Sequence, residues 1–155
     1  MDQHTHIEDL LSLSDVHLDV ALESKNEVLR FLSDRVSERC ETRAGDCRQA
    51  LAAREKLGAT TIGSGVAFPH AQLDGLPAPF AIFLRLAHPL DYAGDGDEPI
   101  DLVVMLLAPT GSTREHLEGL SAFARVLREP ETRKQLRGAS VPAEVITALS
   151  RSRQP

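Results

Sequence analysis

The chain has 155 residues, of which 42% are hydrophobic and 26% charged, proportions that are typical of one soluble globular domain. Its formal net charge is −6, so it lacks the basic footprint on which general nucleic-acid binding depends. The two cysteines, Cys40 and Cys47, lie in one polar stretch without further residues at zinc-ligand spacing. This favours free thiols, and a disulfide between them is the alternative.

The termini and the hydropathy pattern bear on location and domain organisation. No basic region followed by an apolar run opens the chain, so no secretory signal is predicted. The longest strongly apolar window, residues 102–108, is far too short to cross a bilayer. We therefore expect a cytoplasmic protein without direct membrane insertion. Residues 1–6 are expected to be a flexible N-terminus, residues 7–150 one domain, and residues 151–155 a disordered tail.

In the N-terminal part, the spacing of apolar residues predicts a helix, a strand and a second helix. Residues 7–13 have helical spacing, and residues 16–20 alternate apolar and polar side chains as a half-buried strand does. His17 falls on the polar side of this strand and is expected to be solvated. Ser24 followed by Glu27 is a capping-box pattern, and it predicts the start of the second helix.

A third helix is predicted to end at Gly58. The charged residues 38–47 before it predict a loop, from which Asp46 is expected to cap the helix. Arg54 falls in its last turn, where the helix dipole favours a cation. Arg54 is therefore either a capping residue or an anion ligand beside His70.

The second half of the chain alternates buried strands with helices. Strands are predicted at residues 80–86 and 100–107, and the second is nearly continuous in Val, Leu and Met, as buried strands are. A second capping box opens a predicted helix at residues 112–128, and Pro130 and Pro142 open two more. This order predicts an α/β (α+β) fold with one mixed sheet covered by helices.

The stretch that ends at His70 has features that ordinary core segments avoid. Gly63-Ser64-Gly65 predicts a tight turn with positive φ or a close approach of another group. Pro69 fixes its own φ and makes Phe68 extended, so His70 leaves the strand in a restricted direction. These residues alone leave two interpretations open, a nucleophile held in place or a histidine that fills a loop.

His116 falls in the first turn of the helix predicted at residues 112–128. Helix starts carry exposed N–H groups and a partial positive charge, so phosphate binds there readily. A histidine in that turn can donate a hydrogen bond to a phosphate oxygen. A surface histidine without a role is the alternative.

Arg54-Glu-Lys-Leu-Gly, followed by Thr61-Ile-Gly-Ser-Gly-Val-Ala-Phe-Pro-His70, resembles the enzyme IIA family of the bacterial phosphoenolpyruvate:sugar phosphotransferase system, of the fructose/mannitol/nitrogen-regulatory type. The family pattern is an Arg-Glu pair, a Gly-x-Gly turn, an apolar dipeptide, Pro and the phosphorylated His. Asp101-Leu-Val-Val-Met-Leu-Leu-Ala-Pro and His116-Leu-Glu-Gly-Leu-Ser extend the resemblance over nearly the whole chain. It implies the mannitol/fructose-type IIA fold.

The resemblance also implies residue roles and partners. His70 would be the phosphoryl acceptor, with His116 and Arg54 beside it and the Gly63-Ser64-Gly65 amides binding phosphate. A neutral imidazole is nucleophilic near neutral pH, and the labile P–N bond suits a relay that needs no metal or other cofactor. The donor would be a histidine-containing phosphocarrier protein of the HPr or NPr type. The acceptor would be a IIB component or a regulatory target protein.

One departure and the subtype bear on this expectation. The family usually has Gly after the phosphorylated histidine, where this chain has Ala71. If that position needed a positive φ, Ala would be strained by roughly 1 kcal/mol, and we expect that it does not.

The chain's length and its short helix before Val16 are more similar to the stand-alone nitrogen-regulatory proteins than to fructose- or mannitol-specific ones.

Two other classes of function stay open from the sequence. The first is an interaction module in which the relay has decayed and His70 is vestigial, and Ala71 is the feature in its favour. The second is a metal site that uses His70 and His116. This second class lacks a carboxylate or thiolate set with metal-ligand spacing.

Overall fold

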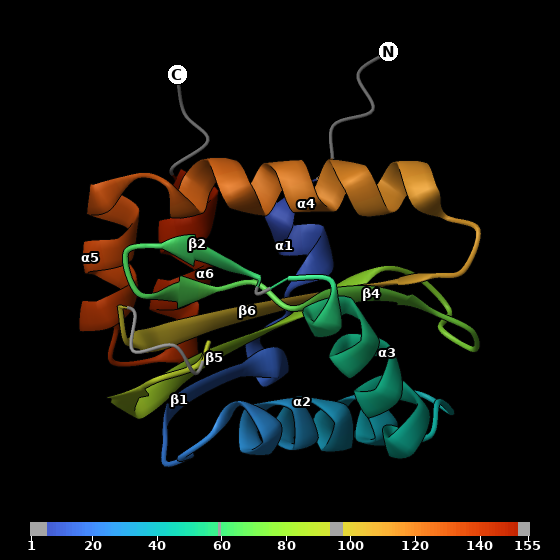
Figure 1. Ribbon diagram of the computed structural model, residues 1–155. Coiled ribbons are helices and arrows are strands. Elements are labelled where there is room, and N and C mark those ends of the chain that lie inside the picture. The colour runs from blue at the N-terminus through green and yellow to red at the C-terminus, as the bar shows by residue number, and fades with distance from the viewer. Residues whose placement is uncertain (1–5, 59, 94–97, 152–155) are drawn as a thin grey trace.

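The computed structural model describes residues 6–58, 60–93 and 98–151, and a mixed sheet with helices on both faces makes up this part (Figure 1). The helices are α1 (Ile7–Leu10), η1 (a 3₁₀ turn, Leu13–Asp15), α2 (Lys25–Arg39), α3 (Ala44–Lys56), α4 (Thr113–Leu127), α5 (Pro130–Gly138) and α6 (Pro142–Arg151). The strands are β1 (Val16–Val20), β2 (Thr61–Gly63), β3 (Val66–Ala67), β4 (His70–Leu73), β5 (Phe80–Leu90) and β6 (Ile100–Pro109). The predicted mixed sheet is confirmed.

Strand β6 is the centre of the sheet. It pairs antiparallel with β5 along one edge and parallel with both β3 and β4 along the other. Val66 lies opposite Leu102, and His70 lies opposite Leu106. Between these two pairings Pro69 lacks an N–H, but its carbonyl still accepts a bond from the Leu106 N–H at 3.0 Å. One continuous stretch of chain thus delivers His70 in register with β6.

The two faces of β6 contribute to two separate cores. Leu102, Val104 and Leu106 pack in the cluster that α1, α4, α5 and α6 cover. Val103, Met105 and Leu107 pack in the cluster that α2 and α3 cover. Successive side chains of a strand point to opposite faces, so a strand covered on both sides must be apolar throughout. This explains the continuous apolar run at residues 102–108.

The helix starts test the two capping-box predictions. At α2 the side-chain cap is confirmed, since the Glu27 N–H donates to Ser24 Oγ at 3.1 Å. The reciprocal bond is shifted by one residue, because the Glu27 carboxylate accepts at 3.0 Å from the N–H of Glu23 instead of Ser24. At α4 the prediction is wrong, because the side chain of Ser112 makes no capping bond. Its φ and ψ of −93° and 49° lie outside the extended region that a capping side chain requires.

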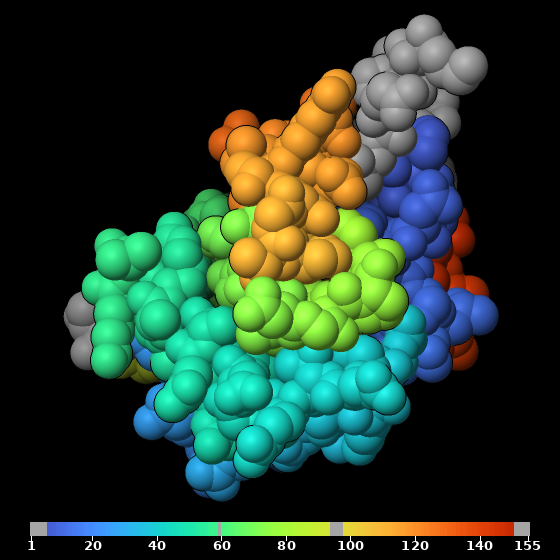
Figure 2. Space-filling model, turned by 90° about the vertical axis from the view of Figure 1, so that its right-hand side faces the viewer, coloured from blue at the N-terminus to red at the C-terminus, as the bar shows by residue number. Residues whose placement is uncertain are grey.

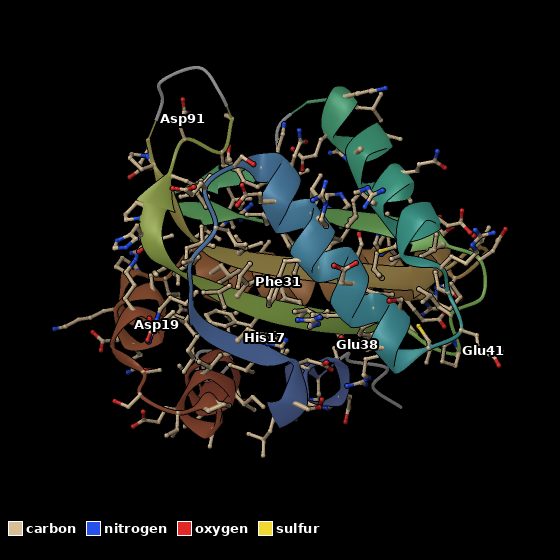
Figure 3. The ribbon with its side chains drawn as sticks, turned by 90° about the horizontal axis from the view of Figure 1, so that it is seen from below. His17, Asp19, Phe31, Glu38, Glu41 and Asp91 are labelled. Atoms are coloured by element: carbon tan, nitrogen blue, oxygen red, sulfur yellow. The ribbon has the colours of Figure 1, made fainter. Side chains whose placement is uncertain are left out.

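Three local predictions need correction. Residues 38–47 are not a continuous loop, since α2 runs to Arg39 and α3 begins at Ala44, so Asp46 lies in the first turn instead of capping it. The first helix ends at Leu10 and a 3₁₀ turn follows. His17 is half-buried, with its ring edge against Phe31 of α2 at 5.2 Å between centroids (Figure 3). The polar side of β1 faces α2, which the alternation of residue types does not reveal.

Other predictions concern the cysteines, the membrane and the termini. Cys40 and Cys47 are free thiols as predicted, and burial raises the pKa of Cys47 to about 11. No helix in the described segments has the length and apolar character needed to cross a bilayer. Of the termini predicted to be flexible or disordered, 1–6 and 151–155, residues 1–5 and 152–155 lie outside the described residues, whereas Arg151 is the last residue of α6.

The turn between β2 and β3 is fastened to the C-terminal part of the molecule. All three residues of the Gly63-Ser64-Gly65 turn have positive φ, of 88°, 57° and 81°. Arg137 Nη2 donates to the Ser64 carbonyl at 2.6 Å, and the same guanidinium makes two bonds of 2.9 Å to the Asp101 carboxylate. The turn is therefore held by α5 and by the start of β6.

We expect Gly65→Ala to lower the free energy of unfolding more than Gly63→Ala. Both substitutions put a side chain at positive φ, which costs about 1 kcal/mol or more. Only at Gly65 would the new Cβ lie 2.6 Å from Arg137 Nη2, whereas a Cβ at Gly63 meets nothing within 4 Å. Urea unfolding of the two variants measures the difference, and equal losses would contradict the proposed anchoring by Arg137.

The ring of Phe123 is fully buried beside Phe68, with ring centroids 6.0 Å apart. We expect Phe123→Ala to lower the free energy of unfolding by about 3–5 kcal/mol, because it leaves a cavity under α4. Leu117, on the same helix but 57% exposed, is the control. Its replacement by Ala should change the value by less than about 0.5 kcal/mol in the same urea titration.

Candidate functional site

Arg54, His70 and His116 come together from three different elements. Arg54 lies in the last turn of α3, His70 is the first residue of β4, and His116 lies in the first turn of α4. Arg54 Nε donates to His70 Nε2 at 3.2 Å, and the rings of His70 and His116 have centroids 5.7 Å apart. Figure 2 views the molecule from the end at which these elements meet.

The three side chains line one open pocket whose other walls are mostly apolar. These walls come from α3, β4 and α4, and consist of Ala50, Ala53, Leu57, Ala71, Gln72 and Leu120. Leu57 is 82% exposed, and Leu117, which follows His116 on α4, is 57% exposed. Large exposed apolar side chains beside a polar centre are typical of surfaces that contact another protein.

The backbone before His70 fixes the orientation of its ring. The Phe68 N–H donates to the Thr60 carbonyl at 2.7 Å, and the Phe68 carbonyl lies 2.8 Å from His70 Nδ1. A carbonyl oxygen only accepts hydrogen bonds, so Nδ1 carries the proton. In the neutral ring, Nε2 therefore presents its lone pair to the pocket and to Arg54.

Both pocket histidines are held in the neutral form. Burial lowers the pKa of His70, and the Arg54 cation lowers it further, while the bond to the Phe68 carbonyl and the Glu55 carboxylate oppose the shift. Burial and then the neighbouring His70 lower the pKa of His116. Since the ordinary value is 6.5, both rings are uncharged at neutral pH.

Arg54 is positioned to bind an anion beside His70 Nε2. Besides its bond to His70, its Nη1 donates to the Gly58 carbonyl at the end of α3 at 3.3 Å. A guanidinium carries more N–H donors than these two bonds use, in a planar fork that matches phosphate oxygens. One nitrogen of Arg54 thus bonds a carbonyl just beyond the end of α3 while another faces His70, and the role as an anion ligand stays a prediction.

The structure does not bring Gly63, Ser64 and Gly65 together with the two histidines. Val66, which follows the turn, pairs with Leu102 of β6, and His70 pairs with Leu106, four residues further along β6. At the rise of a strand, this separates the turn from His70 by roughly 13 Å or more. Its residues do not line the pocket. Their predicted role in binding phosphate at His70 has no support in this geometry, because the strand that follows the turn carries His70 away from it.

Position 71 takes ordinary strand geometry. Ala71 pairs with Leu107 in β4. The described non-glycine residues with positive φ are Asp19 and Ser64, so Ala71 is not strained. The expectation that this position does not need a positive φ is confirmed.

Two pocket-side residues were not predicted from the sequence. Gln72 Nε2 donates to Thr113 Oγ1 at 3.3 Å and so links β4 to the start of α4. The alternation of β4 could have indicated it, because His70 and Gln72 share one face of a strand. Glu55, beside Arg54, is buried and belongs to a cluster beneath the pocket. No group of three His, Cys, Asp or Glu side chains that could hold a metal ion occurs in the described ranges.

Chemically, the site combines a nucleophile with stabilisers of negative charge. The Nε2 lone pair of His70 can act as a nucleophile, and the Arg54 guanidinium and the His116 ring flank it. Phosphoryl transfer needs mainly positioning and the stabilisation of oxygen charge. These three side chains have the chemistry for that reaction.

Sequence comparison gives the family. The model for the phosphoenolpyruvate-dependent sugar phosphotransferase system, EIIA 2, matches residues 9–152. The nitrogen regulatory protein of Bradyrhizobium diazoefficiens is 37% identical over 143 residues, which cover 92% of this chain and 93% of that protein. The fructose-specific EIIA component of Haloferax volcanii is 30% identical over 133 residues, or 85% of this chain and 86% of that protein.

Solved structures agree with this assignment. The nitrogen regulatory protein IIA-Ntr of Neisseria meningitidis superimposes with a TM-score of 0.87 at 32% identity, over 92% of this chain and 98% of that one. The mannitol IIA of Escherichia coli shares the fold, with a TM-score of 0.75 at 21% identity over 89% and 97% of the two chains. From the match over residues 9–152 and these relatives, the chain belongs to the EIIA type 2 family of the phosphoenolpyruvate-dependent sugar phosphotransferase system.

Proposed function

We propose that the protein is a phosphoryl carrier in which Nε2 of His70 accepts a phosphoryl group and passes it on. The observation that carries this proposal is the bond between His70 Nδ1 and the Phe68 carbonyl at 2.8 Å, which leaves the Nε2 lone pair facing Arg54 in the pocket. Burial supports it further, because the lowered pKa of His70 keeps the ring neutral and nucleophilic.

The transfer step balances without a metal or a base. The P–N bond of a donor phosphohistidine breaks as a bond forms between phosphorus and His70 Nε2. This nitrogen carries no proton, so none has to leave. In the product, Arg54 turns from Nε2 to the phosphoryl oxygens, and the His116 ring donates to another of them. The P–N bond formed is labile, so the group can be passed on.

The donor in this proposal is a histidine-containing phosphocarrier protein of the HPr or NPr type. Its own phosphohistidine has to approach His70 closely, so the two proteins must bury the surface around the pocket. The exposed Leu57 and Leu117 and the small residues of α3 offer an apolar rim for that contact. The acceptor is a regulatory target or a IIB component.

We further propose the nitrogen-regulatory subtype, in which the phosphorylation state controls a partner. Support comes from relatives named nitrogen regulatory protein that match over most of both chains, in Bradyrhizobium diazoefficiens and in Pseudomonas aeruginosa, the latter at 39% identity over 117 residues. A phosphoryl group adds about two negative charges to the pocket surface, enough to repel or recruit a partner. Because one relative is a fructose-specific EIIA component, a sugar-specific role is the second candidate function for this chain.

The direct test is intact-mass spectrometry at neutral to alkaline pH after incubation with phosphoenolpyruvate, enzyme I and a phosphocarrier protein of the HPr type. We expect one added phosphoryl group that acid treatment removes. His70→Ala should abolish it, and Arg54→Lys, which replaces the planar fork by a point charge, should slow it by roughly 10²-fold. His88, an exposed histidine of β5, is the matched control, and His88→Ala should react normally.

Phosphorylation of the His70→Ala variant, or no reaction of the unaltered chain with donors that phosphorylate a control protein, would contradict the proposal. The second result would favour an interaction module in which His70 is vestigial. The two subtypes are separated by testing whether the phosphorylated protein transfers its group to a sugar-specific IIB component.

We also expect the His70 imidazole to titrate below pH 6.5, the ordinary value, because burial and Arg54 disfavour the charged ring. Removing the cation should move the midpoint upward, so Arg54→Met should titrate at higher pH than the unaltered chain. NMR of the imidazole Cε1–H signal, assigned with His70→Ala, measures both midpoints. A midpoint above 6.5 in the unaltered chain would contradict the neutral nucleophile.

A further inference from the structure

A buried carboxylate lies directly beside Arg54 in the sequence. Successive helical residues point about 100° apart, so Arg54 faces the pocket while Glu55 faces the interior, where its side chain is 4% exposed. Thr60 Oγ1 donates a short hydrogen bond to Glu55 Oε2. The other carboxylate oxygen, Oε1, lies 3.7 Å from Lys25 Nζ and has no hydrogen-bond partner among the described residues.

Such a group is costly to keep in a fold. Glutamate is almost never buried without close partners, because the charged form loses its hydration. An ion pair at 3.7 Å and one hydroxyl donor satisfy the Glu55 carboxylate only in part. A glutamine or an apolar residue would fill the space with a smaller penalty, so the carboxylate at this position points to a role beyond packing.

Two short chains of contacts connect Glu55 to the reactive ring. In the first chain, the Thr60 hydroxyl donates a hydrogen bond to the Glu55 carboxylate. The Thr60 carbonyl accepts a hydrogen bond from the Phe68 N–H at 2.7 Å. The Phe68 carbonyl in turn accepts the His70 Nδ1 proton at 2.8 Å. Along the second, Glu55 holds the last turn of α3, from which Arg54 Nε reaches His70 Nε2 at 3.2 Å. Glu55 is thus connected to both groups that form hydrogen bonds with the His70 ring, the Phe68 carbonyl and the Arg54 guanidinium.

We propose that Glu55 is a positioning residue for phosphoryl transfer, which fixes the Thr60–Phe68 segment that orients His70 together with the helix end that carries Arg54. This rests on the proposed function of His70. Glu55 touches neither the phosphoryl group nor the reacting nitrogen in this role. It acts through Thr60 and through its sequence neighbour Arg54.

Two further side chains, those of Lys25 and Tyr92, lie beside Glu55. Lys25, the first residue of α2, pairs with it and lies 5.7 Å from the centre of the Tyr92 ring. Tyr92 is almost fully buried, and burial together with the Glu55 carboxylate raises the pKa of its hydroxyl, which therefore stays neutral. The cluster joins the start of α2, the end of α3 and the segment after β5 beneath the pocket.

Glu55 also adds an electrostatic contribution at the active ring. The groups that act on His70 are the Phe68 carbonyl, the Arg54 guanidinium and the Glu55 carboxylate, and the His116 ring faces it from α4. The carboxylate opposes the lowering of the His70 pKa by burial and by Arg54. Removing its charge should therefore move the titration of His70 to lower pH, which tests the electrostatic coupling between Glu55 and the ring.

The experiment compares Glu55→Gln and Thr60→Val with Asp15→Asn in the full chain. Asp15 is the matched control, because its side chain is also 4% exposed and paired with a cation, Arg39, but lies away from the pocket. We expect both test variants to be phosphorylated at least about tenfold more slowly at saturating phosphocarrier. Asp15→Asn should react within about twofold of the unaltered rate while losing comparable stability in urea.

NMR titration supplies the second measurement. The His70 midpoint should fall in Glu55→Gln and stay unchanged in Asp15→Asn. Normal phosphorylation of Glu55→Gln, an unchanged His70 midpoint in that variant, or equal slowing in Asp15→Asn would each overturn the inference. If Glu55→Gln fails to fold, Thr60→Val decides alone, since it removes the hydroxyl but keeps the charge, and a normal rate then overturns the inference.

The two proposals fail in different ways. If the unaltered chain takes up no phosphoryl group from active donors, the proposed function falls. The titration of His70 in Glu55→Gln then still tests the coupling between Glu55 and the ring, and an unchanged midpoint overturns it.

Discussion

The hydrogen bond from His70 Nδ1 to the Phe68 carbonyl is the interaction on which the site depends. It places the proton on one ring nitrogen and leaves the other with its lone pair toward Arg54. The carbonyl is available because Pro69 keeps Phe68 extended, and it is held in place because the Phe68 N–H is bonded to Thr60. The direct orienting partner of the His70 ring is therefore a backbone carbonyl, and a carboxylate can act on the ring orientation only through Thr60 and Phe68.

The rest of the fold gives that bond a rigid base. β6 is buried on both faces, and Leu106 at its centre pairs with His70 across the parallel ladder. The site is assembled from the ends of three elements, the C-terminus of α3, the first residue of β4 and the first turn of α4. The ends of helices and strands leave backbone groups and side chains accessible to a ligand, while the sheet behind them keeps these ends in fixed relative positions. This division explains how an exposed pocket can have fixed geometry.

The sequence was informative wherever local pattern decides structure. Alternation and apolar runs predicted β1, β5 and β6, and the order of glycine, proline and histidine singled out His70. Some local predictions failed at element ends, such as the cap at Ser112 and the loop at residues 38–47. The failures that concern the site depend on tertiary contacts. The pairing of β3 and β4 with β6 separates the Gly63-Ser64-Gly65 turn from His70, and no local signal fixes that register. The burial of Glu55 was equally invisible, since a glutamate in a polar helix end is normally solvated.

A carrier must release its phosphoryl group as readily as it accepts it, and the position of Arg54 suits this requirement. In the structure Arg54 Nε donates to His70 Nε2, so in the proposed transfer this hydrogen bond has to break when phosphorus arrives. A hydrogen bond from a charged donor contributes about 1.5–3 kcal/mol. Contacts to phosphoryl oxygens replace it with a similar free energy, so neither state is strongly favoured. In the proposed transfer, the guanidinium would therefore have a hydrogen-bond acceptor both before and after phosphorus arrives, which favours a reversible step.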